Sequence, residues 1–168
     1  CIRDSIVRLS KQIIYALHRD DLKSASKLVK KIQSEKKKME SICSKNKELY
    51  ATNFYVIAIG EYVEAMLYYS YMKNKKISTH KFLKVPAEGY LFGLIDLTGE
   101  LGRKAVQLAG KDKFKEVVKI KDLVNEIYGE LLKFDFREHD LRRKFDAVKY
   151  NLKKLEDLVL DLKLKGKI

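Results

Sequence analysis

Helix-breaking residues are almost absent from this chain, and this scarcity constrains its fold more than any other feature of the sequence. Proline occurs once, at Pro86, and glycine eight times in 168 residues. Chains with so few breakers and so much Leu, Lys, Glu, Ile and Ala are usually helical. Strand-like alternation bounded by turn dipeptides is absent from the sequence. We therefore predict an all-α protein with a single domain, residues 1–168, long enough to bury a hydrophobic core.

Apolar residues that recur at helical spacing locate the helices along the chain. Asp20 and Asp21 are predicted to cap the second helix, Pro86 to precede the fourth, and Gly110 to end the fourth as a C-cap. A short polar link is expected around residues 78–80, and residues 131–136 form a kink or loop that packs its aromatic side chains. The expected helices span about residues 4–18, 22–42, 52–73, 87–109, 113–129 and 138–164.

The chain is strongly basic, with 36 Lys and Arg against 23 Asp and Glu, a net charge of +13 and a pI of about 9.6. Such an excess attracts polyanions, of which nucleic acid is the commonest and an anionic membrane surface is the rival. The excess of lysine over arginine and the scarcity of glutamine are also typical of hyperthermophiles, and we expect an archaeal source. Nine lysines between Lys23 and Lys47 indicate a solvated helix face or, alternatively, a surface that follows phosphates.

No membrane span and no zinc site are expected. The most apolar run, residues 54–72, contains two glutamates and many tyrosines, so it is too polar to cross a bilayer. Cys1 and Cys43 lie in no metal-binding spacing and are predicted to be free thiols in a reducing cytoplasm. The charged start of the chain does not resemble a signal peptide.

Four carboxylates occur where charges are otherwise missing. Glu61 and Glu64 are the only charges in residues 54–72, and Asp96 and Glu100 are the only charges in residues 89–102. The spacings i,i+3 and i,i+4 place each pair on one face of its helix. Burying a carboxylate without compensation costs several kcal/mol, so these four side chains require partners or a cation.

A divalent metal ion is one form of compensation. Carboxylates on facing helices build metal sites in helical bundles, and an all-oxygen set without histidine suits Mg²⁺ or Mn²⁺. The alternative is that these acids pair with basic groups or contact a neighbouring subunit; Arg103, three residues after Glu100, could satisfy that glutamate alone. A metal site beside a basic surface predicts hydrolysis of phosphodiesters, because the ion activates water and stabilises phosphoryl charge.

Other catalytic chemistry is not visible in the sequence. His18, His80 and His139 lie far apart in polar surroundings and are predicted to be surface residues. No phosphate-binding glycine loop is present. Gly93, Gly99 and Gly102 lie within a predicted helix, where we expect them to permit close helix packing. 

Several segments resemble the translin/Trax family. Residues 141–150 (LRRKFDAVKY) begin a C-terminal helix similar to the family's, with an arginine- and lysine-rich start, a lysine–tyrosine step and a basic–glycine ending at residues 161–166. Residues 90–101 (YLFGLIDLTGEL) resemble its central helix. The N-terminal helix is similar at residues 8–11 and 17–19. The resemblance covers essentially the whole chain.

Within this family the chain resembles the Trax-like members, which carry a ribonuclease site, rather than the translin-like members, which bind nucleic acid. The resemblance lies in the paired glutamates at 61–65 and in residues 96–101; translin-like chains lack that pair and have an apolar residue in place of Asp96. It implies that Glu61, Glu64 and Asp96 hold the metal with Glu100 beside them. It also implies an antiparallel bundle of about seven helices in a closed homo-oligomer, a hexamer or octamer.

Three functions follow as hypotheses. The first is an Mg²⁺- or Mn²⁺-dependent endoribonuclease for single-stranded RNA, with single-stranded DNA as a further ligand. Its expected phosphate contacts are Arg8 and Lys11, from the N-terminal resemblance, and Arg103 and Lys104, from their closeness to the carboxylates. The second is a non-catalytic nucleic-acid-binding shell. The third is a structural subunit that needs a different partner chain for activity.

Overall fold

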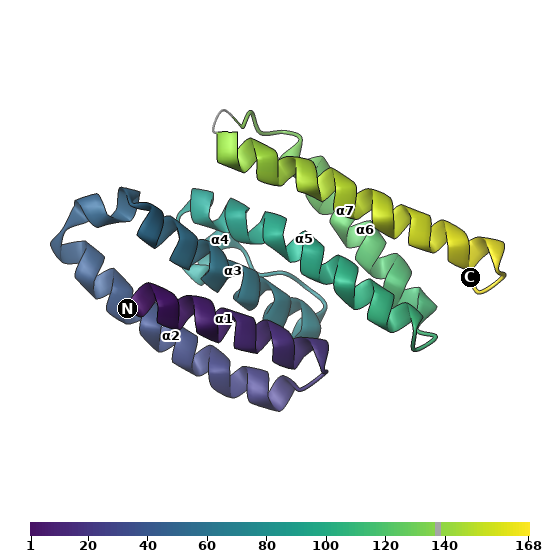
Figure 1. The fold of residues 1–168 in the computed structure, drawn as a ribbon, viewed down its shortest axis with the longest axis horizontal. Coiled ribbons are helices and arrows are strands. Elements are labelled where there is room, and N and C mark those ends of the chain that lie inside the picture. Colours follow the sequence, from purple (N-terminus) through teal and green to yellow (C-terminus); the bar gives the residue numbers. More distant parts are fainter. Residues whose placement is uncertain (137–138) are drawn as a thin grey trace. The chain divides into compact units, whose positions relative to one another are not determined.

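A computed structural model describes residues 1–136 and 139–168. Within these residues the chain is all-α, with seven α-helices, one 3-10 helix and no strand (Figure 1), which confirms the predicted fold class. The predicted start of the last helix at Glu138 lies outside the described residues. The elements are α1 Ile2–His18, α2 Leu22–Lys45, η1 Lys47–Ala51, α3 Asn53–Asn74, α4 His80–Leu83, α5 Ala87–Ala109, α6 Phe114–Leu131 and α7 His139–Leu164.

The helices form two compact units, Cys1–Leu97 and Thr98–Ile168. Helix α5 continues through the boundary between them, so its first half belongs to one unit and its second half to the other. The prediction that residues 1–168 act as a single domain stays a prediction.

Helix α3 is the central element of the first unit. It is buried on almost every side, as expected of a helix that is apolar all round, and it packs with α1 and α2. Its start is capped by Thr52, whose side chain accepts a hydrogen bond from the backbone N–H of Tyr55. Asp21 likewise caps α2 by accepting from the N–H of Ser24 at 2.9 Å, which confirms the predicted cap.

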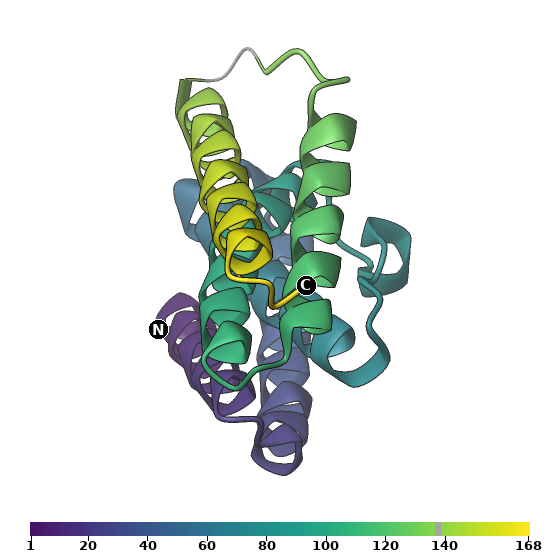
Figure 2. The same ribbon diagram turned by 90° about the vertical axis from the view of Figure 1, so that its right-hand side faces the viewer.

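In the second unit α6 and α7 pack side by side (Figures 1 and 2). Apolar residues such as Val117, Ile120 and Val148 are fully buried there. The predicted aromatic loop after α6 is confirmed: the ring of Phe136 lies 6.0 Å from that of Phe134 and 5.2 Å from that of Phe145, between ring centroids.

Three local predictions needed correction or addition. Helix α5 ends before Gly110 as predicted, but Gly110 is not left-handed; the positive φ, 57°, falls at Asp112. Helices η1 and α4 were not predicted. Helix α4 is a single turn that ends at Leu83 and is followed by Lys84 in the left-handed conformation, with φ 53°. The carbonyl of Lys84 accepts a hydrogen bond from the ammonium group of the buried Lys36 at 3.1 Å.

No helix within the described residues is long and apolar enough to span a membrane. Both cysteines are free thiols, as predicted, with Cys1 exposed and Cys43 buried.

Burial of Tyr62 gives the first unit a predictable response to alkaline pH. Burial, and secondarily the charge of Glu40, raises the pKa of Tyr62 from 10.0 to about 12. The unfolded chain therefore loses this proton first, and the free energy of unfolding should fall as pH rises from about 10 to 12. Chemical denaturation across this window should show a smaller fall in Tyr62→Phe than in the wild type. Equal falls would contradict the assignment.

Candidate active site and nucleic-acid interface

Helix α3 carries the first carboxylate pair into the interior of its unit. The side chain of Glu64 is buried, with 9% of the residue exposed, whereas Glu61 is half-buried. The backbone carbonyl of Glu61 accepts a hydrogen bond from the hydroxyl of Ser10 on α1 at 2.8 Å. Neither glutamate is without an interaction partner.

Glycines bring the first half of α5 very close to α3. A Cβ added at Gly93 would lie 2.5 Å from Cγ1 of Val63 and 2.8 Å from the backbone nitrogen of Glu64, and one added at Gly89 would overlap Ile59. Gly89 faces Ile59 and Gly93 faces Val63, so residue numbers increase in the same direction on both helices. The two helices therefore run parallel here. The prediction that Gly93 permits close packing is confirmed.

The two carboxylates of α5 follow these glycines along the same helix. Asp96 follows Gly93 by three residues and therefore projects from the same side of α5; it is half-buried. Glu100, also half-buried, lies one turn further along α5, in the second unit. Both acids have interaction partners.

The donor set fits a hard divalent ion. Glu61, Glu64 and Asp96 offer only oxygen atoms, the ligands that Mg²⁺ and Mn²⁺ prefer, and the half-burial of two of them leaves access from solvent. In the part of the chain that the structure describes, no three His, Cys, Asp or Glu side chains lie close enough together to hold a metal ion. The metal ligation therefore stays a prediction, and it requires the carboxylate side chains to move toward one another.

One residue near this site was misjudged from the sequence. His18 was predicted at the surface, but it is 5% exposed, and its Nδ1 lies 3.1 Å from the hydroxyl of the fully buried Tyr68. Tyr68 follows Glu64 by one turn of α3. Ser10 and His18 of α1 thus bond to α3 at Glu61 and at Tyr68. The sequence did contain a signal for this burial, because Ser10 and His18 both fall on the apolar stripe of α1. Of the other two histidines, His80 is half-buried, and the side chain of His139 lies outside the described residues.

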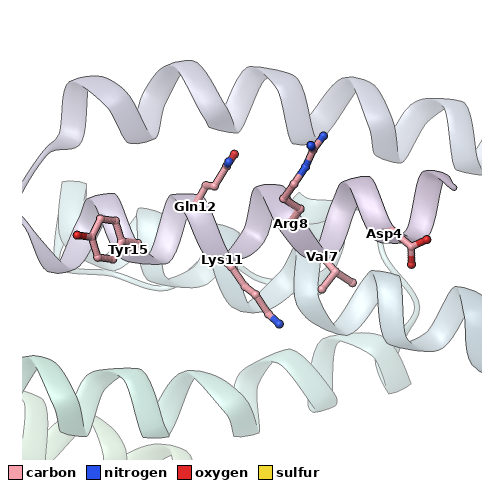
Figure 3. Close-up of a pocket in the computed structure, with 6 residues that line it drawn as sticks. All are labelled: Asp4, Val7, Arg8, Lys11, Gln12 and Tyr15. Atoms are coloured by element: carbon pink, nitrogen blue, oxygen red, sulfur yellow. The ribbon is translucent and has the colours of Figure 1, made fainter.

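Arg8 and Lys11, predicted phosphate contacts, line one groove on the exposed side of α1 (Figure 3). The groove has a volume of about 570 Å³ and is completed by Asp4, Val7, Gln12 and Tyr15. Tyr15 is 59% exposed, and the guanidinium of Arg19 lies over its ring, 5.6 Å from the centroid. Cations beside an exposed aromatic ring are typical of surfaces that bind single-stranded nucleic acid.

The other two predicted phosphate contacts differ in exposure. Arg103 is exposed and lines a groove of the second unit. Lys104 is only 2% exposed and has an interaction partner, so it presents little surface to a phosphate. The lysine-rich face of α2 is mostly solvated, except that Lys36 is buried and pairs with Glu40 at 2.6 Å.

Comparison with known proteins identifies the family. Residues 2–166 match the Translin family, so the chain belongs to the translin family. This confirms the resemblance read from the sequence motifs at the level of the family.

Two solved structures share the fold. The crystal structure of apo-NeC3PO is 31% identical, with a TM-score of 0.88 and coverage of 95% of this chain and 84% of that chain. The structure of an AfC3PO–duplex RNA complex is 20% identical, with a TM-score of 0.84 and coverage of 98% and 86%, a likeness of fold alone.

Sequence relatives include translin from Gallus gallus, 32% identical over 79 residues, and an uncharacterized protein of Methanocaldococcus jannaschii, 28% identical over 169 residues. The match to the Gallus translin covers 47% of this chain and only 34% of that protein. The Methanocaldococcus match covers 91% of this chain and 72% of its relative.

Two glycines of α5 test the helix contact. Gly93→Ala should destabilise the protein by about 1–3 kcal/mol, because its methyl group would overlap Val63 and the α3 backbone. Gly102→Ala is the matched control: a Cβ there meets nothing within 4 Å, so the better helix former should be neutral or stabilising by roughly 0.5–1 kcal/mol. Urea unfolding measures both; similar effects at the two positions would contradict the close contact.

Proposed function

We propose that this chain is a Trax-like member of the translin family, a metal-dependent endoribonuclease that acts on single-stranded RNA. The observation that carries the proposal is the glycine-mediated contact of α3 and α5, at which the buried Glu64 and the half-buried Asp96 lie on neighbouring helices. Carboxylates placed in this way on apolar helices are costly unless they are compensated, and a divalent ion would compensate them.

In this proposal Glu61, Glu64 and Asp96 hold Mg²⁺ or Mn²⁺. The bound ion would supply Lewis acidity toward a phosphoryl oxygen and an acidified water. Glu100, four residues after Asp96 on α5 but in the second unit, stays a predicted supporting acid. Ser10 and His18 hold the α3 backbone and Tyr68 in place around the glutamate pair through their hydrogen bonds.

The exposed groove of α1 would recruit the substrate. Arg8 and Lys11 provide the positive charge, and the ring of Tyr15 offers a stacking surface for an unpaired base. Arg103 would be a further phosphate contact. We propose single-stranded DNA as a second ligand, a closed homo-oligomer of six or eight chains, and a cytoplasmic setting. The AfC3PO structure, which shares the fold, was solved with duplex RNA.

A non-catalytic nucleic-acid-binding protein is the second candidate. Two observations favour it: no three potential ligands lie together within the described residues, and each of the four acids already has an interaction partner. In that case the carboxylates stabilise the core or a subunit interface, and the cationic surface alone serves the function.

The glutamate pair separates these candidates. Glu61→Gln combined with Glu64→Gln should lower Mn²⁺-dependent cleavage of a labelled single-stranded RNA by at least about 100-fold, as expected for loss of a catalytic metal. RNA affinity should be retained or raised, because two negative charges are removed. Calorimetric titration with Mn²⁺ should show loss of binding in the variant.

The matched control is Glu126→Gln with Glu130→Gln, the same change of charge on exposed positions of α6. It should leave cleavage and Mn²⁺ binding unchanged. Cleavage that persists in the Glu61/Glu64 variant, or that resists EDTA in the wild type, would refute the metal site. Binding without cleavage under every metal condition would favour the second candidate.

The α1 groove can be tested by the salt dependence of binding. Loss of two phosphate contacts in Arg8→Ala with Lys11→Ala should make the slope of log affinity against log salt less negative by about 1.4 for a single strand. Lys27→Ala with Lys30→Ala removes the same charge from exposed positions of α2. Anisotropy titrations at several salt concentrations measure both slopes. Equal changes would show a general charge effect and no specific groove.

A further inference from the structure

The second unit has its own groove, between α5 and α7. Its volume is about 280 Å³. It is hollow because two glycines of α5 line it: a Cβ at Gly102 would meet nothing within 4 Å, and one at Gly99 would make only an ordinary contact, 3.7 Å, with Nδ2 of Asn151. The sequence prediction that these two glycines permit close packing is therefore wrong. They keep a surface open.

The polar half of the groove is cationic and ordered. Arg103 on α5 and Lys154 on α7 line it, and both are exposed. Asn151 is held in place, since its Nδ2 donates to the hydroxyl of Thr98 at 3.1 Å. Two cations and an amide on facing helices can bind the oxygen atoms of a phosphodiester from two sides.

An exposed aromatic ring stands beside these cations. Tyr150, immediately before Asn151, is 60% exposed, and the ammonium group of Lys154 lies 4.3 Å from its ring centroid. A tyrosine this exposed contributes little to the core, whereas a cation on its ring pre-organises it as a platform for a base.

The same combination occurs on α1 in the first unit. There Tyr15 is exposed with Arg19, four residues later, over its ring, and Gln12 supplies an amide to the groove that Arg8 and Lys11 line. Each unit thus has an exposed tyrosine, a cation four residues later, and a groove with an amide and at least one further cation. A combination of tyrosine, cation and amide that occurs in both units is explained less easily by chance than one that occurs once.

The remaining wall of the α5–α7 groove is apolar, formed by Val106, Leu155 and Leu158. A volume just below the roughly 300 Å³ at which ligand pockets usually begin suits one nucleotide rather than a duplex. We infer that this groove is a single-nucleotide subsite for single-stranded RNA, with a phosphodiester between Arg103 and Lys154 and an unpaired base on Tyr150. The inference rests on the nucleic-acid binding proposed above and not on cleavage.

Charge favours RNA over a second copy of the chain as the occupant. The groove's polar side is positive, and the whole chain carries +13. A second copy that docked here would have to present an acidic surface, whereas a polynucleotide brings the opposite charge along its whole length and releases counterions.

The test measures binding of a fluorescein-labelled oligouridine 12-mer in EDTA, so that cleavage is absent. Tyr150→Ala should weaken binding at least about fivefold, the lower range for loss of one stacked base, and Tyr150→Phe should stay within about twofold, because it keeps the ring. Lys154→Ala should weaken binding more than Lys153→Ala, a neighbouring exposed lysine outside the groove. Affinity for a 12-base-pair RNA duplex should not respond to Tyr150→Ala.

A second measurement uses the wild type alone. Oligouridine with 5-iodouridine should form a photo-crosslink that mass spectrometry assigns to Tyr150. The inference is overturned if Tyr150→Ala binds like the wild type, if Tyr150→Phe is as weak as Tyr150→Ala, or if no crosslink maps to α7. It is also overturned if Tyr150→Ala changes the sedimentation coefficient and not RNA affinity, which would make this face a subunit interface. Loss of nuclease activity in another variant leaves these outcomes unaffected.

Discussion

The close approach of α3 and α5 is the contact on which the proposed site depends. Helix α3 is buried nearly all round, and Gly89 and Gly93 let the backbone of α5 lie directly against it. Any side chain at those two positions would push the helices apart, since interiors are packed too densely to absorb a methyl group without strain. The distance between Glu64 and Asp96 is therefore set by residues that have no side chains of their own.

This arrangement also explains why polar residues occur within the apolar interface of α1 and α3. A buried polar group is tolerated only when it is hydrogen-bonded, and Ser10 and His18 each meet this condition by bonding to α3. Their bonds meet α3 at Glu61 and at Tyr68. Apolar packing already opposes sliding of α1 along α3, and these directional bonds add a further constraint on the register.

Most helix boundaries could be predicted because the signals that set them are local. The side chain of Asp21 caps α2, and Ala87 begins α5 directly after Pro86. Helix α4 was missed although Thr79 caps its start, because a single turn is too short to show a helical period. Its end is also held by a distant residue, since the carbonyl of Lys84 bonds to Lys36, 48 residues away in the sequence. The candidate acids were visible as charges within apolar helices, but whether their side chains meet depends on rotamers that spacing does not determine. Gly99 and Gly102 were misread because, in the sequence, a helical glycine that leaves a surface open looks the same as one that permits close packing, such as Gly93.

The proposed binding and the proposed cleavage would have separate physical origins in this chain. The cations that would hold RNA lie on exposed faces of α1, α5 and α7, where they are solvated at little cost, and they need no precise geometry to attract a polyanion. The carboxylates lie on a buried helix and its neighbour, where each costs stability unless it is compensated. Substitution of the acids can therefore abolish catalysis while recruitment persists, but a chain that kept only the acids would gain nothing from them. On this argument the buried Glu64 is the residue whose presence a nuclease would explain best, and the grooves alone would serve a binding protein equally well.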